Sequence, residues 1–406
     1  MTLPPLTPLM PVAEALAMVL SAAQHINETI DVPLLDAHGY VLSQDVLSTI
    51  DVPPADNSAM DGYALRASDT EQTLAVSQRI PAGTVGSPLE EACAARIFTG
   101  AAIPAGADAV VMQENCTEVA GKVSVSGSVI TGQNIRYRGQ DIKSGDTVLE
   151  KGRILRPQDM GMLASIGCAR AKVYRPLRVA VLSTGDELFE PGSGELPEGG
   201  IYNSNRYTLA GLLSNLHMEF VDCGMVVDDA DATAQALRNA SELADCVITT
   251  GGVSVGEEDH VKAQVQRLGR LDLWKLAIKP GKPLAFGSIG NTSFIGLPGN
   301  PTSVFVTFCL IARPFLLKMQ GVAEPESPRL QAVAAFSVSK PGGRQDYLRV
   351  IVENTSQGLL AKKFSNQSSG VLSSVSHSNA LAVIPPGVVV SEGDTLEIIL
   401  LDSIAG

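Results

Sequence analysis

Hydrophobic positions from residue 176 to residue 323 follow the rhythm of an α/β domain. Short runs that are apolar at nearly every position alternate with longer stretches of helical spacing, which predicts buried strands and covering helices. The predicted strands are 177–184, 219–227, 245–250, 284–289 and 292–297, and the predicted helices are 205–216, 231–244, 260–268 and 301–319. We therefore expect a three-layer α/β/α domain with a mostly parallel sheet, whose ligands gather at the carboxyl ends of the strands.

The pattern changes on both sides of this domain. Helical spacing returns in 10–24 and 156–167, whereas short apolar runs separated by Gly, Pro, Asp and Asn between 45 and 145 predict a small β-rich domain. After residue 325 the helical period fades, and apolar runs predict a C-terminal barrel or sandwich. The expected domains are an elongated helical linker domain (1–45 with 145–175), a β-rich domain (46–144), the α/β domain (176–323) and a C-terminal β-barrel-like domain (324–406).

Composition narrows the classes of function. The 406 residues are 45% hydrophobic and 18% charged, which is typical of a globular protein with several domains. The net charge of −13 argues against binding to nucleic acid or to an anionic membrane. The best candidate for a membrane span, 304–317, contains Arg313 and Pro314, and the first basic residue is Arg66, so we expect neither a span nor a targeting signal. Six scattered cysteines without a C-x-x-C pair predict free thiols in a cytoplasmic protein.

Three turns rich in glycine follow three of the predicted strands. Their sequences are STGDEL (183–188), TTGGVSVGEED (249–259) and GLPGNPTS (296–303). Because parallel strands present their carboxyl ends at one edge of a sheet, we expect the three turns to meet in one crevice. Glycines permit close approach of the backbone to a ligand, and the N–H groups of a turn that starts a helix bind anions. Neither the dinucleotide fingerprint nor the P-loop occurs in the sequence.

Acidic and basic side chains lie on or between these turns. Glu187 and Asp259 either point into the crevice or belong to a polar turn and an exposed helix start. Lys275, Lys279 and Lys282 lie in WKLAIKPGKP, between two of the turns. Any one of these lysines alone is more simply read as a solvated surface residue. Their concentration in an acidic protein nevertheless favours an oxyanion pocket.

The β-rich domain contributes a second set of polar candidates. Asp61 lies in DNSAMDGYA, Thr99 in IFTGAAIP, and Arg136 and Asp141 in NIRYRGQDI. For each aspartate, a turn-forming role competes with a catalytic one. No histidine lies beside a serine or cysteine nucleophile in the sequence, and no closely spaced His/Cys set occurs, so a zinc site is not expected.

Several of these segments together resemble the MoeA family, the molybdopterin molybdenumtransferases related to the E domain of gephyrin. The segments are DNSAMDGYA, TGAAIPAGADAVVMQE, NIRYRGQDI, STGDEL, TTGGVSVGEED, WKLAIKPGKP and GLPGNP, in the order that the family shows. The resemblance covers almost the whole chain and is weakest after residue 325. There SNQSSG (365–370) is loosely similar to a C-terminal binding segment of the family.

The resemblance implies an activity and an assembly. The expected reaction inserts molybdate into the dithiolene of adenylylated molybdopterin with release of AMP, uses Mg²⁺, and belongs to molybdenum cofactor biosynthesis. The expected assembly is a homodimer of L-shaped outline with four domains per subunit and an active cleft formed across the dimer. The adenylyltransferase of the same pathway is an expected partner.

The resemblance also implies site residues, by matching motifs. The catalytic positions are Asp61, Thr99, Asp141, Glu187, Asp259, Lys275 and Lys279. The substrate-binding positions are Arg136, Gly251, Gly252, Ser254, Pro298, Gly299, Asn300, Pro301 and Ser368, and the metal positions are Glu187, Asp228 and Asp259. Asp229 is adjacent to Asp228, so the metal position assigned to Asp228 is equally compatible with Asp229.

Other classes of protein remain compatible with the sequence. One is a carrier that binds molybdopterin without chemistry, and another is a scaffold, because a relative in this family clusters receptors. A nucleotide-binding enzyme of the doubly wound type is disfavoured by the missing fingerprint. Release of AMP from the adenylylated pterin in the presence of molybdate would distinguish a transferase from a carrier.

Overall fold

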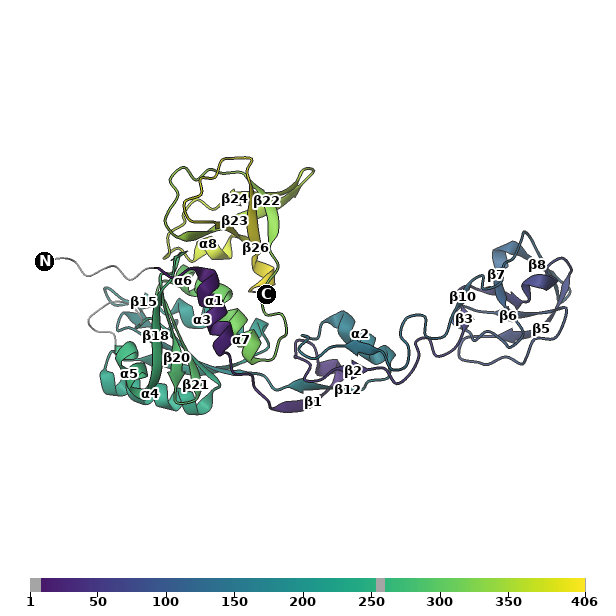
Figure 1. The fold of residues 1–406 in the computed structure, drawn as a ribbon, viewed down its shortest axis with the longest axis horizontal. Helices are drawn as coiled ribbons and strands as arrows, with labels where there is room; N and C mark the ends of the chain where they lie inside the picture. The colour runs from purple at the N-terminus through teal and green to yellow at the C-terminus, as the bar shows by residue number, and fades with distance from the viewer. Residues whose placement is uncertain (1–8, 253–259, 406) are drawn as a thin grey trace.

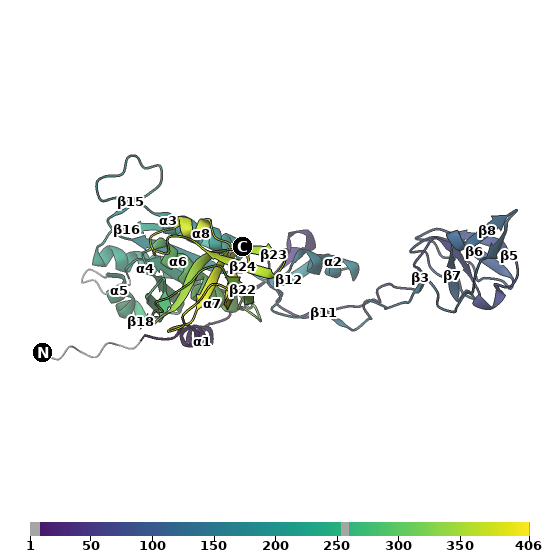
Figure 2. The same ribbon diagram turned by 90° about the horizontal axis from the view of Figure 1, so that it is seen from above.

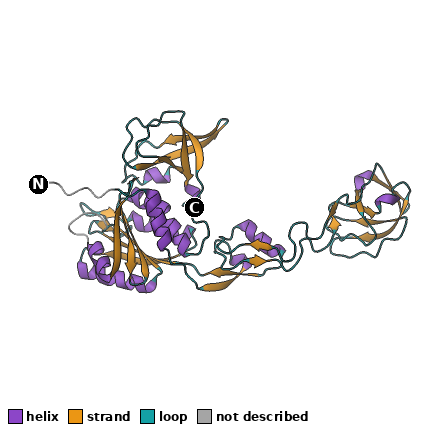
Figure 3. Cartoon of the chain, in the orientation of Figure 1, coloured by secondary structure: helices purple, strands orange, loops and turns teal. Residues whose placement is uncertain are grey.

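The chain forms an elongated molecule in which a narrow arm connects a distal body to two adjacent bodies (Figures 1 and 2). The computed structural model describes residues 9–252 and 260–405. We name the parts the arm (29–50 and 142–174), the distal domain (51–141), the α/β domain (177–322) and the barrel domain (329–405). Most helices lie in the α/β domain, while strands dominate the distal and barrel domains (Figure 3).

A six-stranded sheet forms the centre of the α/β domain. Its strands are β13 (Arg178–Thr184), β16 (Glu219–Val226), β17 (Cys246–Thr250), β18 (Gly269–Lys275), β20 (Pro283–Ile289) and β21 (Thr292–Leu297). They lie in the order β16-β13-β17-β21-β20-β18, of which the first four are parallel and the last two continue the sheet in antiparallel orientation. The prediction of a mostly parallel sheet is confirmed, with the antiparallel strands together at one edge.

Helices cover both faces of this sheet because successive residues of a strand point to opposite sides. The helices are α1 (Val12–Ala22), α3 (Ser204–Asn215), α4 (Ala230–Leu243), α5 (His260–Leu268), α6 (Pro301–Thr307) and α7 (Arg313–Met319). Val179 and Val181 of β13 belong to the core that contains α1, α3, α6 and α7. Ala180 and Leu182 belong to the core that contains α4 and α5. The expected three-layer architecture is therefore confirmed.

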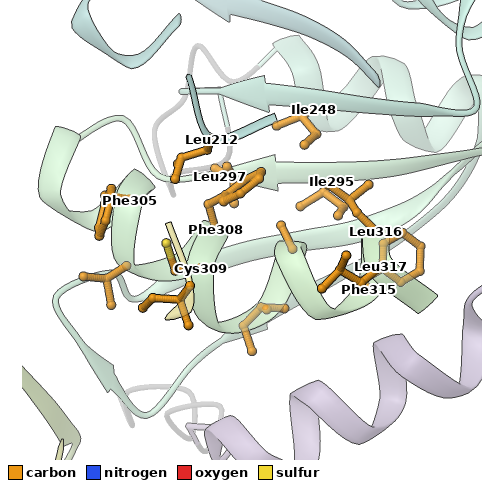
Figure 4. Close-up of a cluster of buried hydrophobic side chains, with 14 of the residues drawn as sticks. Leu212, Ile248, Ile295, Leu297, Phe305, Phe308, Cys309, Phe315, Leu316 and Leu317 are labelled. Carbon is orange, nitrogen blue, oxygen red and sulfur yellow. The ribbon is translucent and has the colours of Figure 1, made fainter. Parts of the chain in front are cut away.

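The apolar stretch 301–319 runs through the larger of these two cores. It consists of α6, a π-helical turn (Phe308–Ala312) and α7, which follow one another without a break (Figure 4). Its length and composition would suit a membrane span, but 89% of it is buried inside the protein. Phe308 and Phe315 are completely buried in the same core as Ile295. The stretch is therefore a core helix, as the sequence indicated.

The arm contains two short antiparallel ladders, one α-helix and a short 3₁₀ helix (Leu34–Asp36). β1 (Thr29–Pro33) pairs with β12 (Arg170–Tyr174), β2 (Val46–Leu47) pairs with β11 (Thr147–Leu149), and α2 spans Pro157–Ser165. Asp159 in the first turn of α2 is buried and accepts hydrogen bonds from Arg153 and Arg156 at 2.8 Å and 3.0 Å. The chain passes outward and returns through these ladders, so they join the distal domain to the rest of the molecule.

The distal domain is a small β structure, as the sequence predicted. Its strands are β3 (Asn57–Ser58), β4 (Gly62–Leu65), β5 (Leu74–Ile80), β6 (Cys93–Ile97), β7 (Ala109–Met112), β8 (Cys116–Val119), β9 (Lys122–Val125) and β10 (Ile135–Arg136). Six of them form a sheet in the order β7-β4-β6-β5-β9-β8, and β3 pairs with β10 in a separate ribbon.

Strands near the C-terminus close into a barrel of five. They are β22 (Leu330–Ala334), β23 (Gln345–Thr355), β24 (Gly358–Lys363), β25 (Ala380–Ile384) and β26 (Thr395–Leu400), with α8 (Ser373–Ser376) between β24 and β25. The ring closes because β23 pairs with both β24 and β25. β19 (Ile278–Lys279) of the α/β domain pairs in parallel with the start of β23, which joins the two domains.

The structure adds two features that the sequence did not indicate. Residues 12–22, which lie in the stretch that we assigned to the linker domain, form α1, and its apolar face packs on α7 of the α/β domain. Residues 269–275, where we expected no strand, form β18 at the edge of the sheet. Arg270, Asp272 and Lys275 interrupt the apolar run there, and charged side chains are common on edge strands.

Candidate functional site

The three glycine turns meet at the carboxyl ends of β13, β17 and β21, which are neighbours in the sheet. Gly251 has φ of +86°, and a Cβ added there would lie 2.9 Å from the carbonyl oxygen of Thr184. A Cβ added at Gly299 would lie 3.9 Å from the Cα of Gly251. Gly251 can have no side chain without strain, because its φ is positive and its neighbours are close. The convergence expected from the sequence is therefore confirmed.

A cavity of about 510 Å³ opens beside these turns. Predicted substrate-binding residues that line it are Gly251, Gly252, Pro298, Gly299, Asn300 and Ser368. Pro301 begins α6 directly after the turn. Ser254 and Asp259 lie outside the described residues. The cavity thus gathers segments from the α/β domain and the barrel domain.

Basic side chains of the cavity come from both domains. Lys279 and Lys282 belong to the WKLAIKPGKP segment, and Arg344 precedes β23 in the barrel domain. The Nη1 of Arg344 donates a hydrogen bond to the carbonyl oxygen of Ile278 at 3.0 Å. Lys275, which we predicted as catalytic, lies in β18 and is not among the lining residues, whereas Lys282 is. The sequence motif contains both Lys275 and Lys282, but it did not indicate which of the two lines the cavity.

The bend between Lys279 and Lys282 depends on a second glycine. Gly281 has φ of +94°, and a Cβ added there would lie 2.5 Å from the Oγ1 of Thr307 in α6. The bend therefore packs directly against the core helix, between the two lysines. A side chain at residue 281 would meet Thr307 and would be strained by the positive φ, so glycine is the residue that fits there.

A loop of the barrel domain completes the wall. Gln367, Ser368 and Ser369 line the cavity. The carbonyl oxygen of Ser369 accepts a hydrogen bond of 3.1 Å from the backbone N–H of Thr302 in α6. The Oγ1 of Thr302 donates to the carbonyl oxygen of Val371 at 3.0 Å. The first turn of α6, which the sequence suggested as an anion seat, thus uses one of its N–H groups to hold this loop.

Buried polar side chains next to the turns form hydrogen bonds that hold them in place. The Oγ1 of Thr250 and the Oγ of Ser183 are 3.1 Å apart, and Ser183 in turn contacts Asn203, the N-cap of α3. The Nδ2 of Asn205 donates to the carbonyl oxygen of Gly299 at 2.7 Å. Asn203 also caps α3, because its side chain accepts a hydrogen bond from the backbone N–H of Arg206. The contact of Asn205 with Gly299 could not be predicted from the sequence, because the two residues are far apart along the chain.

The acidic candidates of the α/β domain lie around the first turn. Glu187 precedes the short strand β14 (Leu188–Phe189), and the Oδ1 of Asp186 accepts a hydrogen bond of 3.3 Å from the backbone N–H of Asp228. Asp229 caps α4 by accepting hydrogen bonds from the N–H groups of residues 231 and 232. Because Asp229 serves as this cap, Asp228 is the better candidate of the two for the predicted metal position. Within the described residues, no three His, Cys, Asp or Glu side chains form a ready metal cluster.

The second set of candidates lies in the distal domain. The Oδ1 of Asp61 accepts hydrogen bonds from the backbone N–H and the Oγ1 of Thr99 at 2.7 Å and 2.8 Å. The backbone N–H of Thr99 is the main reason why the pKa of the Asp61 carboxyl lies below its usual value, followed by the Thr99 hydroxyl. Arg136 lies in β10 opposite Asn57, and the N–H of Asp141 donates to the carbonyl oxygen of Val52.

The two sets are far apart within one chain. The distal domain stands at the opposite end of the arm from the turns and the cavity, in both views of the molecule (Figures 1 and 2). A single subunit therefore does not bring Asp61 and Thr99 to Lys279. If all of these residues act on one substrate, the distal set must come from another copy of the chain.

Three family profiles match consecutive parts of the chain. They are the MoeA N-terminal region (domain I and II) over residues 10–167, a "probable molybdopterin binding domain" over 180–318, and the MoeA C-terminal region (domain IV) over 331–401. The matches follow the order of the arm with the distal domain, the α/β domain and the barrel domain.

Named relatives and solved structures agree with these profiles. A molybdopterin molybdenumtransferase of Haemophilus influenzae is 44% identical over 86% of this chain and 88% of its own length. Molybdopterin molybdenumtransferase 2 of Mycobacterium tuberculosis is 35% identical over 91% of this chain and 94% of its own length. The crystal structure of the molybdopterin biosynthesis MoeA protein of Pyrococcus horikoshii has a TM-score of 0.86 at 34% identity, covering 97% of this chain and 100% of that one. The chain therefore belongs to the MoeA family of molybdopterin molybdenumtransferases, which are transferases of molybdenum cofactor biosynthesis.

Proposed function

We propose that this chain inserts molybdate into the dithiolene of adenylylated molybdopterin and releases AMP. The observation that carries the proposal is the cavity beside the three turns, where Lys279, Lys282 and Arg344 gather in a protein with a net charge of −13. Ammonium and guanidinium groups bind oxyanions well, and an arginine can offer two parallel donors. Molybdate and a phosphoanhydride are both oxyanionic, so this lining suits either.

The turns offer the place for the pterin and its anhydride. Gly251 and Gly299 let the backbone approach a ligand at the strand ends, which is where α/β sheets bind their ligands. The lysines would neutralise negative charge while the phosphoanhydride is cleaved. The dithiolene sulfurs of the substrate would ligate the molybdenum, so no cysteine of the protein is needed for this step.

The expected Mg²⁺ suits the acidic turn. Magnesium is commonly held by one or two carboxylates together with the phosphates of the substrate. Glu187 and Asp228 lie on segments that touch through the hydrogen bond between Asp186 and the N–H of Asp228. These carboxylates would hold the ion, with Asp259 as a further candidate, and the ion would neutralise the anhydride oxygens.

A homodimer would unite the two sets of candidates. Exposed apolar side chains occur near both sets, with Ile201 and Tyr202 of β15 (Ile201–Tyr202) beside the acidic turn and Met60 and Tyr137 in the distal domain. Such residues are suited to an interface between subunits. The distal domain of one subunit would then bring Asp61, Thr99, Arg136 and Asp141 to the cavity of the other.

The test uses purified protein with adenylylated molybdopterin, molybdate and Mg²⁺, and follows AMP release and cofactor formation. Wild-type protein should release AMP in a molybdate-dependent manner, and Lys282→Ala and Asp61→Ala should each lower the rate severely while leaving the fold intact. If the pterin is bound but AMP release never depends on molybdate, the protein is a carrier. Ligand-independent capture of a protein partner by an inactive chain would indicate a scaffold.

Mixing two inactive variants tests the shared site. When Asp61→Ala and Lys279→Ala subunits are allowed to exchange, half of the dimers contain one intact cleft if the site is formed across the dimer. About a quarter of the wild-type rate should then return. No recovery in a mixture that has demonstrably exchanged subunits would mean that each chain acts with its own residues only.

A further inference from the structure

Arg349 in β23 is the largest completely buried side chain described in this protein. Its hydrogen-bonding groups contact neutral partners: Nε donates to the Oγ of Ser374 at 3.2 Å and Nη1 to the carbonyl oxygen of Tyr347 at 3.0 Å. Nη2 has no hydrogen-bond partner within the described part of the chain. Burial lowers the pKa of Arg349 to about 10, so the group is still charged at neutral pH.

Nearby Asp346 offsets part of this lowering of the pKa, but within the described residues no carboxylate accepts a hydrogen bond from the guanidinium. A buried charge without such a partner is costly, so a simple core role does not account for it. An apolar side chain of similar length would fill the same space at lower cost. Arginine is instead suited to holding several oxygen acceptors in fixed directions. The acceptors here are the Oγ of Ser374 and the backbone of β23, and this arrangement fixes one segment of the barrel domain.

The segment is the loop 364–374, which carries Ser368 to the cavity. The side chain of Gln367 forms two hydrogen bonds with the backbone of Arg349: its Oε1 accepts from the N–H at 3.0 Å and its Nε2 donates to the carbonyl oxygen at 2.8 Å. The N–H of Phe364 donates to the same carbonyl oxygen. The backbone of Arg349 therefore holds the first residues of the loop.

The side chain of Arg349 holds the other end of the loop, at Ser374. Ser374 is fully buried, accepts the hydrogen bond from Nε of Arg349, and donates from Oγ to the carbonyl oxygen of Val371 at 2.6 Å. The same carbonyl oxygen accepts the hydrogen bond from Thr302. One residue of the barrel thus fixes both ends of the loop, and Thr302 holds its middle against α6.

We propose that Arg349 is a positioning residue that holds the loop 364–374 in place, so that Ser368 and Ser369 form part of the oxyanion cavity. The inference rests on the proposed function, because it assumes that the cavity binds molybdate. Arg349 does not line the cavity and acts through the loop. Loss of its hydrogen bonds should weaken molybdate binding without removing any group that touches the anion.

The test measures molybdate binding by calorimetry together with hydrogen exchange of the backbone. Ser374→Ala removes one acceptor of the guanidinium with little change in volume, and Arg349→Met replaces the charge with an apolar side chain of similar length. We expect Ser374→Ala to weaken binding about fivefold and Arg349→Met more strongly, with faster exchange confined to 364–374. Arg349→Lys should restore part of the affinity.

Matched controls lie on the same barrel. Arg329→Met removes an exposed arginine that is paired with Glu397, and Ser403→Ala removes a hydroxyl that donates to the carbonyl oxygen of Leu400. Neither should change binding or loop exchange. Unchanged affinity and unchanged loop exchange in Ser374→Ala, or in a folded Arg349→Met variant, would overturn the inference. If wild-type protein binds no molybdate, or if Lys282→Ala binds it equally well, the proposed function fails instead.

Discussion

The ammonium group of Lys279 lies 2.7 Å from a carboxylate oxygen of Asp346, and the two residues stand opposite each other in the ladder between β19 and β23. Lys279 belongs to the α/β domain and Asp346 to the barrel domain, so this ion pair crosses the boundary between them at the wall of the cavity. The carboxylate of Asp346 competes with any anion for Lys279. The positive charge that the cavity presents therefore depends on how firmly the pair is held.

Asp346→Asn should strengthen molybdate binding several-fold, because Lys279 would lose a competing negative charge while the backbone ladder remains. Titration with molybdate at low and high salt measures the effect, which should shrink as salt increases. Glu397→Gln is the control, because it removes an equal charge from the ion pair with Arg329 elsewhere on the barrel. Equal gains in both variants would show that only the net charge matters.

Gly281→Ala should lower stability more than Gly290→Ala. Both glycines have positive φ, so both alanines carry the cost of that conformation, but only the Cβ at Gly281 meets an atom, the Oγ1 of Thr307 at 2.5 Å. We expect a further loss of about 1–3 kcal/mol from this overlap, measured by denaturant unfolding. Thr307 has no hydrogen-bond partner for Oγ1 within the described residues, so adding Thr307→Ala should recover much of it. A double variant as unstable as the single one would contradict the steric explanation.

Asn205→Ala should loosen the turn that contains Gly299, because it removes the 2.7 Å hydrogen bond that joins this turn to α3. We expect a loss of about 1–2 kcal/mol in the free energy of unfolding and faster exchange of the backbone around residue 299. Asn215→Ala at the exposed end of the same helix is the comparison, since its Nδ2 donates to the carbonyl oxygen of Ala405 and not to a glycine turn. If both variants behave alike, the turn does not depend on Asn205.

Thr99→Val should raise the pKa of Asp61 toward its ordinary value of 3.8, because the hydroxyl hydrogen bond is lost while the backbone one remains. The pKa of Asp61 in the folded protein is lowered, so its contribution to stability is present above the ordinary value and is lost as the pH falls through the lowered one. In the variant this contribution is smaller. Carboxyl NMR titration measures the shift, and the pKa of Asp51, lowered mainly by the N–H of Ser144, should not move. An unchanged Asp61 titration would exclude the hydroxyl as a cause.

Much of the architecture could be predicted because burial imposes regular patterns on the chain. Strands such as β13 are apolar on both faces, and α4 and α5 show helical spacing, so the layers followed directly. The meeting of the three turns followed from the rule for parallel sheets. The edge strand β18 was missed because charged residues interrupt its pattern. The packing of α1 on α7 could not be predicted because an apolar helix face does not indicate which element it contacts.

The candidate site was predictable where its residues lie in short motifs. The lysine motif predicted an anion site, but it did not show that Lys282 lines the cavity while Lys275 does not. Arg344 and Gln367 gave no signal, since their role arises only when the barrel packs on the α/β domain. Arg349 looked like an ordinary strand residue, because its burial is visible only in three dimensions.

The ladder between β19 and β23 consists of only two residue pairs. The barrel also shares a hydrophobic core with the α/β domain, because Tyr347, Leu381 and Ile399 pack in the same cluster as Phe305 and Leu317. A rotation of the barrel about the ladder would have to break this apolar contact and the hydrogen bond between Thr302 and Ser369. The cavity is therefore preorganised, and little conformational entropy is lost when an anion enters it.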